Sequence, residues 1–292
     1  MKKSLMLSAP AKINIGLWVK HKRQDGYHEL ASIMQTISLA DTITLKEISE
    51  PGIQIFCNHP DVPLDSTNLV HRAAMLFLEK FSIEPCLAIN IDKKIPVAAG
   101  LAGGSTDAAA VFTGLARMYD KPITVNDLMN MASTLGSDIP FVLHGGLALA
   151  EGRGENLKFF EPPRPPLSVV VVVPVGVKVS TRWAYENYVP GNNSAKGEAF
   201  AQILEAYRRR DLDNLRRYVF NDLESVTLHR HPEVEKIKQL LDSTGEGVVL
   251  MSGSGPSVFG LFADRKAAMR AVKNLHGQKV DVFIEHIKRK NQ

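Results

Sequence analysis

The residues most able to do chemistry in this chain form a run of small side chains ending in two hydroxyls, at positions 96–106, here called the glycine loop. A predicted strand over residues 87–91 leads into the loop, and an alanine-rich helix is predicted over residues 105–119. Backbone N–H groups can approach a phosphate closely only where side chains are small, and the positive end of a helix dipole adds to the attraction. Ser105 or Thr106 could cap the helix, contact a phosphate or help to hold a magnesium ion. The loop therefore predicts an anion site, although a glycine-rich turn with an ordinary cap uses the same residue types.

Other motifs for phosphate or metal chemistry are absent from the sequence. No lysine follows the loop glycines as a P-loop requires, and no G-x-G-x-x-G run suggests a dinucleotide site. The histidine–arginine–aspartate and aspartate–phenylalanine–glycine motifs of protein kinases are also missing. His28 and Glu29 begin like a zinc-binding helix, but position 32 is serine, so the second histidine ligand is lacking.

Two polar side chains are expected on one face of a strand near the N-terminus. Apolar residues at positions 13, 15, 17 and 19 alternate with other types, which predicts a strand with one buried face. Lys12 and Asn14 fall together on the opposite face. From the residues alone, Lys12 is either an exposed edge charge or a functional cation.

Strands and helices mix along the chain without the strict alternation of a doubly wound sheet, so we predict an α+β fold in both halves. The later predicted elements are a valine-rich strand over 169–173, helices over 200–207, 232–241 and 264–276, and a strand near 280–284. Four prolines within residues 162–166 predict a stiff, extended connector. We therefore predict two domains, residues 1–160 and residues 167–292.

Composition sets limits on partners and compartment. The chain has 292 residues, 45% of them hydrophobic, and a formal net charge of +4, which suits an anionic small substrate better than a nucleic acid. Two cysteines suggest a reducing compartment. The apolar stretch near the N-terminus is too short for a signal peptide, and no segment is long enough to cross a membrane, so we expect the cytoplasm. The basic runs at 208–210 and 288–290 are expected to be solvated.

Three segments, in order along the chain, resemble the galacto-, homoserine, mevalonate and phosphomevalonate (GHMP) kinases. They are residues 10–17 with 23–30, the glycine loop with residues 135–141, and residues 251–257, here called the serine–glycine loop. Residues 25–28, Asp-Gly-Tyr-His, and 137–140, Ser-Asp-Ile-Pro, are similar to the branch of the family that acts on a cytidine-bearing substrate. The resemblance implies a two-domain fold, with a ribosomal-protein-like α+β domain followed by a ferredoxin-like α+β domain. The loop departs from the family's commoner Gly-Leu-Gly-Ser-Ser-Ser by reading Gly-Leu-Ala-Gly-Gly-Ser at 100–105.

The resemblance also implies a reaction: transfer of the γ-phosphoryl group of ATP, with Mg²⁺, to the 2-hydroxyl of a diphosphocytidyl-methylerythritol in isoprenoid precursor synthesis. Asp138 is implied as the catalytic carboxylate, held at the mouth of an apolar strand, and Lys12 as the lysine that keeps it ionised and offsets phosphate charge. Asn68 and Lys94 are implied adenine contacts. The phosphates of ATP would bind the glycine loop: Pro96, Val97, Ala98, Ala99, Gly100, Leu101, Ala102, Gly103, Gly104, Ser105 and Thr106.

Five side chains are implied in recognition of the second substrate. His28 would hydrogen-bond the cytosine, Tyr27 would stack on it, and Tyr185 would supply a second aromatic face. Core packing beside a neighbouring tryptophan explains Tyr185 equally well. Asn14 would contact the methylerythritol, and Thr181 a substrate phosphate.

Alternative interpretations remain open at this point. The serine–glycine loop is either a tight turn or a loop that closes over the phosphates. A related kinase acting on mevalonate, homoserine or a sugar would keep both loops but would have no use for Tyr27 and His28. An RNA- or anion-binding module would share the architecture of the N-terminal half, but the mild charge and the lack of interleaved aromatic and basic residues weigh against it.

Overall fold

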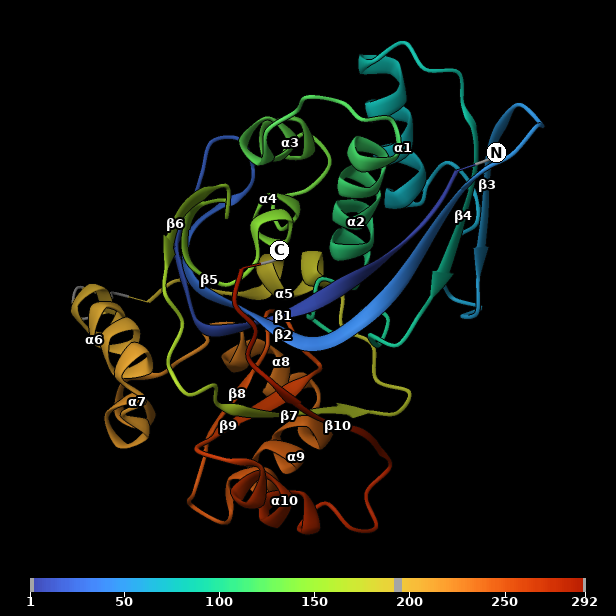
Figure 1. Ribbon diagram of the computed structural model, residues 1–292. Helices are drawn as coiled ribbons and strands as arrows, with labels where there is room; N and C mark the ends of the chain where they lie inside the picture. Colours follow the sequence, from blue (N-terminus) through green and yellow to red (C-terminus); the bar gives the residue numbers. More distant parts are fainter. Residues whose placement is uncertain (1–2, 192–195, 291–292) are drawn as a thin grey trace. The chain divides into compact units, whose positions relative to one another are not determined.

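The computed structural model describes residues 3–191 and 196–290 and contains α-helices and β-strands in both halves of the chain (Figure 1). The predicted α+β class is confirmed. The elements in chain order are β1 (Ser4–Lys22), β2 (His28–Glu47), β3 (Gly52–Cys57), α1 (Leu69–Lys80), β4 (Cys86–Asp92), α2 (Gly103–Met118), α3 (Val125–Ala132), α4 (Ile139–His144), β5 (Leu147–Gly152), β6 (Asn156–Phe160), β7 (Ser168–Pro174), α5 (Thr181–Asn187), α6 (Lys196–Arg209), α7 (Leu212–Tyr218), α8 (Glu224–Arg230), α9 (Pro232–Asp242), β8 (Val248–Met251), β9 (Val258–Phe262), α10 (Arg265–Lys273) and β10 (Val280–His286).

The chain divides into two compact units, and the long strands β1 and β2 contribute residues to both. The first unit contains the described residues up to Ala11, then Leu39–Val97 and Ala102–His144. The second contains Lys12–Ser38, Ala98–Leu101 and the described residues from Gly145 onward.

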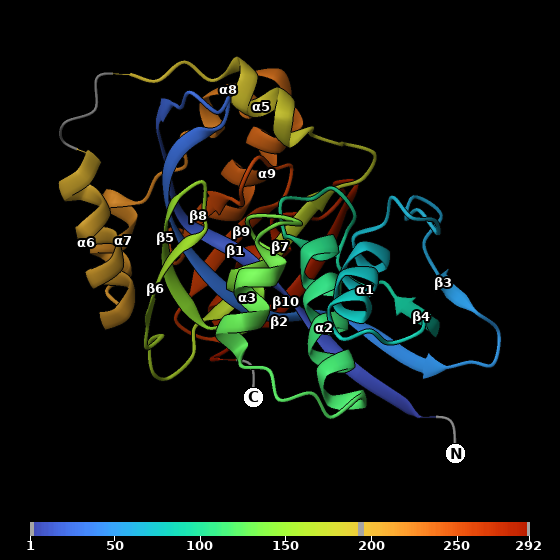
Figure 2. The ribbon, with the colours of Figure 1, turned by 90° about the horizontal axis from the view of Figure 1, so that it is seen from above.

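In the first unit, helices cover a small sheet. The second part of β2 pairs antiparallel with β4, from Thr42 opposite Asp92 to Glu47 opposite Leu87, and β4 pairs parallel with β3. Helices α1 and α2 lie side by side in both views (Figure 1; Figure 2). A Cβ on Gly114 of α2 would come within 2.5 Å of Leu45 Cδ1, so the absence of a side chain lets α2 pack closely against β2.

The second unit contains two sets of paired strands. The first part of β2 pairs antiparallel with β5, and β5 pairs antiparallel with β6. The other sheet has the antiparallel order β10-β7-β9-β8, and α9 and α10 pack against it (Figure 1). The central place of β7 accounts for its unbroken valine run, because both of its faces are covered.

Most predicted elements are confirmed, and the prediction for the two faces of β1 is corrected. The strands over 169–173 and 280–284 and the helices near 200–207, 232–241 and 264–276 are present as β7, β10, α6, α9 and α10. β1 is buried on both faces from residue 9 to residue 17. On the face that carries Lys12 and Asn14, a Cβ on Gly253 would meet both of these side chains, and Phe200 and Ile203 of α6 lie against Gly16. The prediction of one buried face is therefore wrong.

The proline-rich connector lies between β6 and β7, and the described backbone there is neither helix nor strand. The strands that precede the connector pair with one another, and the strands that follow it pair with one another. Only single β-bridges among the described residues join the two groups. The domain division at the connector stays a prediction. No helix among the described residues is both long and apolar enough to cross a membrane.

Candidate active site

The glycine loop leaves β4 and enters α2 through a backbone that turns left-handed at alternate positions. Ala98, Gly100 and Ala102 have φ values of 54°, 76° and 59°. The left-handed conformation costs a residue with a Cβ about 1–2 kcal/mol, so the surrounding structure must impose it on the two alanines. Left-handed residues in alternation can direct successive N–H groups into one concavity that attracts anions. The loop thus has the backbone that the predicted phosphate site requires, and nucleotide binding itself stays a prediction.

Helix α2 begins at Gly103, two residues before the predicted start, and neither hydroxyl caps it. Its N-cap residue is Ala102, and no side chain of the described residues makes a capping hydrogen bond there. The Thr106 hydroxyl instead donates to the Pro10 carbonyl at 2.6 Å. The first N–H groups of a helix lack acceptors within the helix. The interpretation of Ser105 or Thr106 as the cap is therefore wrong, and the first turn of α2 is open to an external acceptor.

Lys12 and Asn14 lie on one face of β1, as their spacing predicts, and form a buried polar pair there. Lys12 is 5% exposed, and its Nζ donates to Asn14 Oδ1 at 2.6 Å and to the Gly100 carbonyl at 3.3 Å. Asn14 Nδ2 donates in turn to Ser32 Oγ at 2.7 Å. Lys12 is thus not an exposed edge charge, and its ammonium lies at the middle of the glycine loop.

The serine–glycine loop, far along the chain, also contacts the Gly100 carbonyl. Ser252 Oγ donates to Gly100 O at 3.0 Å, and a Cβ on Gly100 would lie 2.2 Å from Ser252 O. A Cβ on Gly253 would lie 3.6 Å from Lys12 Nζ. The Thr181 and Ser254 hydroxyls are 3.0 Å apart. The second unit therefore brings four predicted site residues, Lys12, Asn14, Gly100 and Thr181, together with the serine–glycine loop.

Of the three aromatic residues expected at the cytosine, two contact each other. The rings of His28 and Tyr185 have centroids 5.5 Å apart and are tilted by 32°. A base between two rings needs about 7 Å, twice the contact distance of carbon atoms, so no base fits between these two. Burial lowers the pKa of His28, and the nearby charge of Lys22 lowers it further, so both favour the neutral imidazole.

Tyr27 has different surroundings from His28. Tyr27 is 58% exposed, and the Arg153 guanidinium lies 5.1 Å from the centroid of its ring. This cation–π contact leaves the ring accessible for stacking. The role of Tyr27 stays a prediction.

Asp138 lies directly before α4, which corrects the expected setting of this residue. The sequence predicts an apolar strand after Asp138, but Ile139–His144 form a helix, with Val142 N donating to Asp138 O at 3.1 Å. A short apolar run fits a buried helix as well as a buried strand, and five of the six residues of α4 are buried. Asp138 belongs to the first unit and Lys12 to the second, and their pairing stays a prediction.

The two implied adenine residues also have structural partners. Asn68 caps α1, accepting from Val70 N at 3.0 Å and donating to Pro63 O at 2.6 Å. The Lys94 backbone N–H donates to Asp41 Oδ1 at 2.6 Å. Their contact with adenine stays a prediction.

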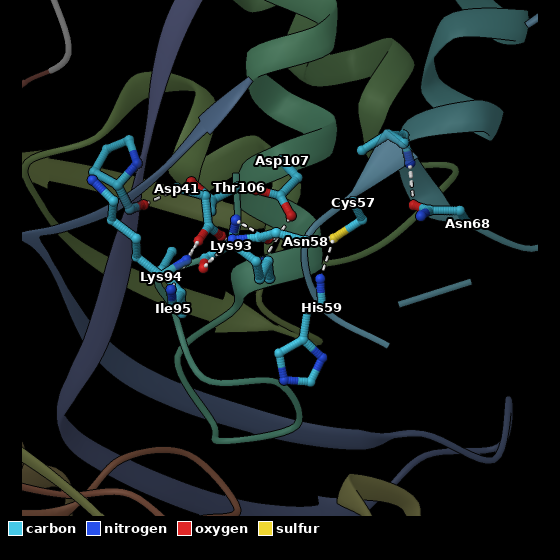
Figure 3. A network of polar contacts seen from close by, with 12 residues as sticks. Asp41, Cys57, Asn58, His59, Asn68, Lys93, Lys94, Ile95, Thr106 and Asp107 are labelled. Carbon is cyan, nitrogen blue, oxygen red and sulfur yellow. Dashed lines mark hydrogen bonds and ion pairs between the residues drawn. The ribbon is translucent and has the colours of Figure 1, made fainter. Parts of the chain in front are cut away.

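Sequence reasoning missed a buried group of charged residues next to the glycine loop. Asp41, Lys93 and Asp107, here called the carboxylate–lysine cluster, lie together in the first unit (Figure 3). A signal for Asp41 was present, because it falls on the apolar stripe of β2 between Leu39 and Ile43. A carboxylate in such a stripe requires a buried partner.

A second missed residue, Asn221, supports the serine–glycine loop. Its Nδ2 donates to Met251 O at 2.8 Å and to Gly253 O at 2.7 Å. No feature of the surrounding sequence indicates this role.

Two family models match this chain, and together they cover more than half of it. The model described as GHMP kinases N terminal domain matches residues 68–146, and the one described as GHMP kinases C terminal matches residues 203–280. The chain therefore belongs to the GHMP kinases, enzymes that transfer a phosphoryl group from ATP.

Individual members of the family and solved structures are also similar to this chain. A 4-diphosphocytidyl-2-C-methyl-D-erythritol kinase of Acaryochloris marina is 44% identical, over 90% of this chain and 88% of that protein. One of the same name from Lachnoclostridium phytofermentans is 45% identical, over 91% of each chain. A solved 4-(cytidine 5'-diphospho)-2C-methyl-D-erythritol kinase is 34% identical, with a TM-score of 0.78 over 97% of this chain and 99% of that chain. A homoserine kinase from Cytophaga hutchinsonii shares the fold, with a TM-score of 0.79 at 20% identity, over 100% of this chain and 96% of that chain.

Proposed function

We propose that this protein transfers the γ-phosphoryl group of ATP to the 2-hydroxyl of 4-diphosphocytidyl-2-C-methyl-D-erythritol, in the cytoplasm, during isoprenoid precursor synthesis. Relatives with that kinase name, 42–45% identical over 90–94% of this chain, support the substrate. The geometric observation that carries the proposal is at Gly100. Its carbonyl accepts from Lys12 Nζ and from Ser252 Oγ, so one residue from each of the three family segments meets there.

The glycine loop and the first turn of α2 are the proposed phosphate-binding groups. The loop offers backbone N–H groups, and the uncapped start of α2 adds the positive end of a helix dipole. The Lys12 ammonium, at the loop carbonyl of Gly100, supplies a full positive charge to the phosphate oxygens.

In the proposed reaction the 2-hydroxyl oxygen attacks the γ-phosphorus while the bond to the β-phosphate oxygen breaks and ADP leaves. Asp138 orients the hydroxyl and takes its proton. Asn14 contacts the methylerythritol with a side-chain amide that hydrogen bonds to Lys12 and Ser32 hold in place. Thr181 contacts a substrate phosphate from its position beside Ser254.

Cytosine recognition is assigned to His28, Tyr27 and Tyr185. A neutral imidazole has one donor and one acceptor nitrogen, and the cytosine edge has an amino donor beside an acceptor, so the two edges match. The contact between His28 and Tyr185 fixes the imidazole, and the exposed ring of Tyr27 offers the stacking face.

Magnesium completes the proposal and would neutralise phosphate charge when bound. In the described part of the chain, no three His, Cys, Asp or Glu side chains lie close enough to hold a metal by themselves. Mg²⁺ bound mainly by ATP phosphates and water needs no such group. The half-buried Ser105 hydroxyl, in the first turn of α2, is the side chain that fits such an ion.

The direct test is a transfer assay with the purified protein, γ-labelled ATP and Mg²⁺. We expect label to appear on 4-diphosphocytidyl-2-C-methyl-D-erythritol and not on mevalonate or homoserine. Equal labelling of mevalonate would replace the cytidine substrate with that of a related kinase. Salt-dependent RNA retention without ATP turnover would instead favour an RNA-binding module.

A further inference from the structure

The carboxylate–lysine cluster lies at both ends of the glycine loop (Figure 3). Lys93 Nζ donates to Asp107 Oδ2 at 2.8 Å and also contacts Asp41 Oδ2. The side chains of Lys93, Asp41 and Asp107 are 4%, 0% and 3% exposed, so water does not screen these contacts.

The cluster joins the residues that enter the loop to those that leave it. Asp41 Oδ1 accepts from the backbone N–H groups of Lys94 and Ile95, at 2.6 and 2.8 Å, just before the loop begins. Asp107 follows the last loop residue and lies in the second turn of α2. One ammonium group therefore fixes the distance between the two ends of the loop.

The first residue of α2 is shaped to this ammonium group. A Cβ on Gly103 would lie 2.9 Å from Lys93 Nζ and 3.2 Å from Ile95 Cγ2. Glycine at position 103 therefore lets the first turn of α2 rest against the lysine.

Stability alone does not account for the cluster. It contains two carboxylates for one ammonium, and among the described residues Asp107 Oδ1 has no hydrogen-bond partner. Burial raises the pKa of Asp107 to about 7, although Lys93 opposes the shift. Apolar side chains of similar volume often stabilise a core as well as a buried ion pair does or better. What an apolar core would not supply is a fixed, directional link between the two ends of the loop.

We propose that Asp41, Lys93 and Asp107 are positioning residues that hold the glycine loop in the conformation that binds the phosphates of ATP. The inference rests on the proposed function of the loop. It assigns the cluster no contact with either substrate.

Two variants separate geometry from charge. Asp107→Leu leaves one lysine and one carboxylate, a balanced pair, but removes the link to α2. Lys93→Arg keeps the positive charge and changes the length and shape of the side chain that carries it. Asp107→Asn is the conservative partner, because its amide oxygen can still accept from Lys93. Leu115→Ala is the matched control, since Leu115 is buried on the same helix, eight residues after Asp107, and takes part in none of the hydrogen bonds of the cluster.

The measurements are Kd for the ATP analogue AMPPNP with Mg²⁺ by calorimetry, KM for both substrates, and Tm. We expect Asp107→Leu to weaken AMPPNP binding and raise the KM for ATP at least tenfold, with the KM for the cytidine substrate changed less than twofold. Lys93→Arg should weaken AMPPNP binding at least fivefold. Asp107→Asn and Leu115→Ala should stay within twofold of the native protein, although Leu115→Ala lowers Tm.

Native-like AMPPNP binding by both Asp107→Leu and Lys93→Arg would overturn the inference. The inference would also be overturned if Leu115→Ala lost as much AMPPNP affinity as Asp107→Leu for the same loss of Tm, because the loss of affinity would then follow from reduced stability alone. If the native protein itself fails to bind AMPPNP, the proposed function fails, and the inference fails with it. Failure of the inference alone appears as a native protein that binds and variants that bind equally well.

Discussion

The helices α2 and α3 of the first unit begin in opposite ways. At α3, Thr124 Oγ1 accepts from Asp127 N at 3.1 Å, and Asp127 Oδ2 accepts from Thr124 N at 3.2 Å. At α2, the left-handed Ala102 stands at the cap position, and no side chain in the described ranges accepts from the first turn. The capped start satisfies its own N–H groups, whereas the uncapped one leaves them available to a phosphate.

Asp138, just before α4, could belong to either kind of helix start. Asn caps a helix as well as Asp does, so Asp138→Asn should leave Tm nearly unchanged if the residue is a cap or a catalytic group. Turnover separates the two roles, because an amide cannot take the proton. We expect kcat to fall by about 10²–10⁴-fold, measured by transfer to the cytidine substrate at saturating ATP. Near-native kcat in a folded Asp138→Asn protein would contradict the catalytic role and would make Asp138 a helix cap, the role that Thr124 has at α3.

Gly100→Ala tests whether the loop before α2 depends on its contact with the serine–glycine loop. The new methyl would meet Ser252 O at 2.2 Å, at a φ of +76°. We expect kcat/KM to fall at least about tenfold, as the loop carbonyl moves away from Lys12. Gly277→Ala is the matched control, because Gly277 has a φ of +78° with nothing within 4 Å of a Cβ. That variant should lose about 1–2 kcal/mol of stability from backbone strain and keep its kcat/KM; equal losses of activity in both variants would contradict the importance of the contact.

The carboxylates near the two helix starts should respond to pH with opposite sign. The pKa of Asp107 is raised from 3.8 to about 7 in the folded protein, so its contribution to stability is lost as pH rises from about 4 to about 7. The pKa of Asp127 is lowered by its bonds to Thr124, so its contribution is lost as pH falls below about 4. Asp107→Asn should therefore flatten the fall in unfolding free energy between pH 5 and pH 7, a slope of at most about 1.4 kcal/mol per pH unit. Urea unfolding at several pH values measures it, and an unchanged slope in Asp107→Asn would rule this carboxyl out as its source.

Thr124→Ala should have the smallest effect and should be confined to stability. Loss of a side-chain cap costs about 1 kcal/mol, which thermal unfolding detects. The KM for ATP should not change, because this helix start is closed by its own residues. A raised KM for ATP in Thr124→Ala would remove the distinction between the two helix starts.

Features with a local cause were predicted correctly. The valine run predicted β7, and the alternation of apolar residues from position 13 to position 19 predicted a strand at β1. The same local rules failed at α2, where the helix begins before the hydroxyls because the left-handed Ala102 already turns the chain into it. They also failed at α4, because a short apolar run lacks the length that separates helix from strand.

By itself, the sequence determined the kinase family, the glycine loop and the polar face of β1, because each depends on residue types at short, fixed spacings. The tertiary structure alone decided that Lys12 and Ser252 meet at the Gly100 carbonyl, across 88 and 152 positions of sequence. It alone also decided that Lys93 lies between Asp41 and Asp107, 52 and 14 positions away. A buried charge in the sequence shows that a partner is needed, but which partner it finds depends on how the strands and helices pack.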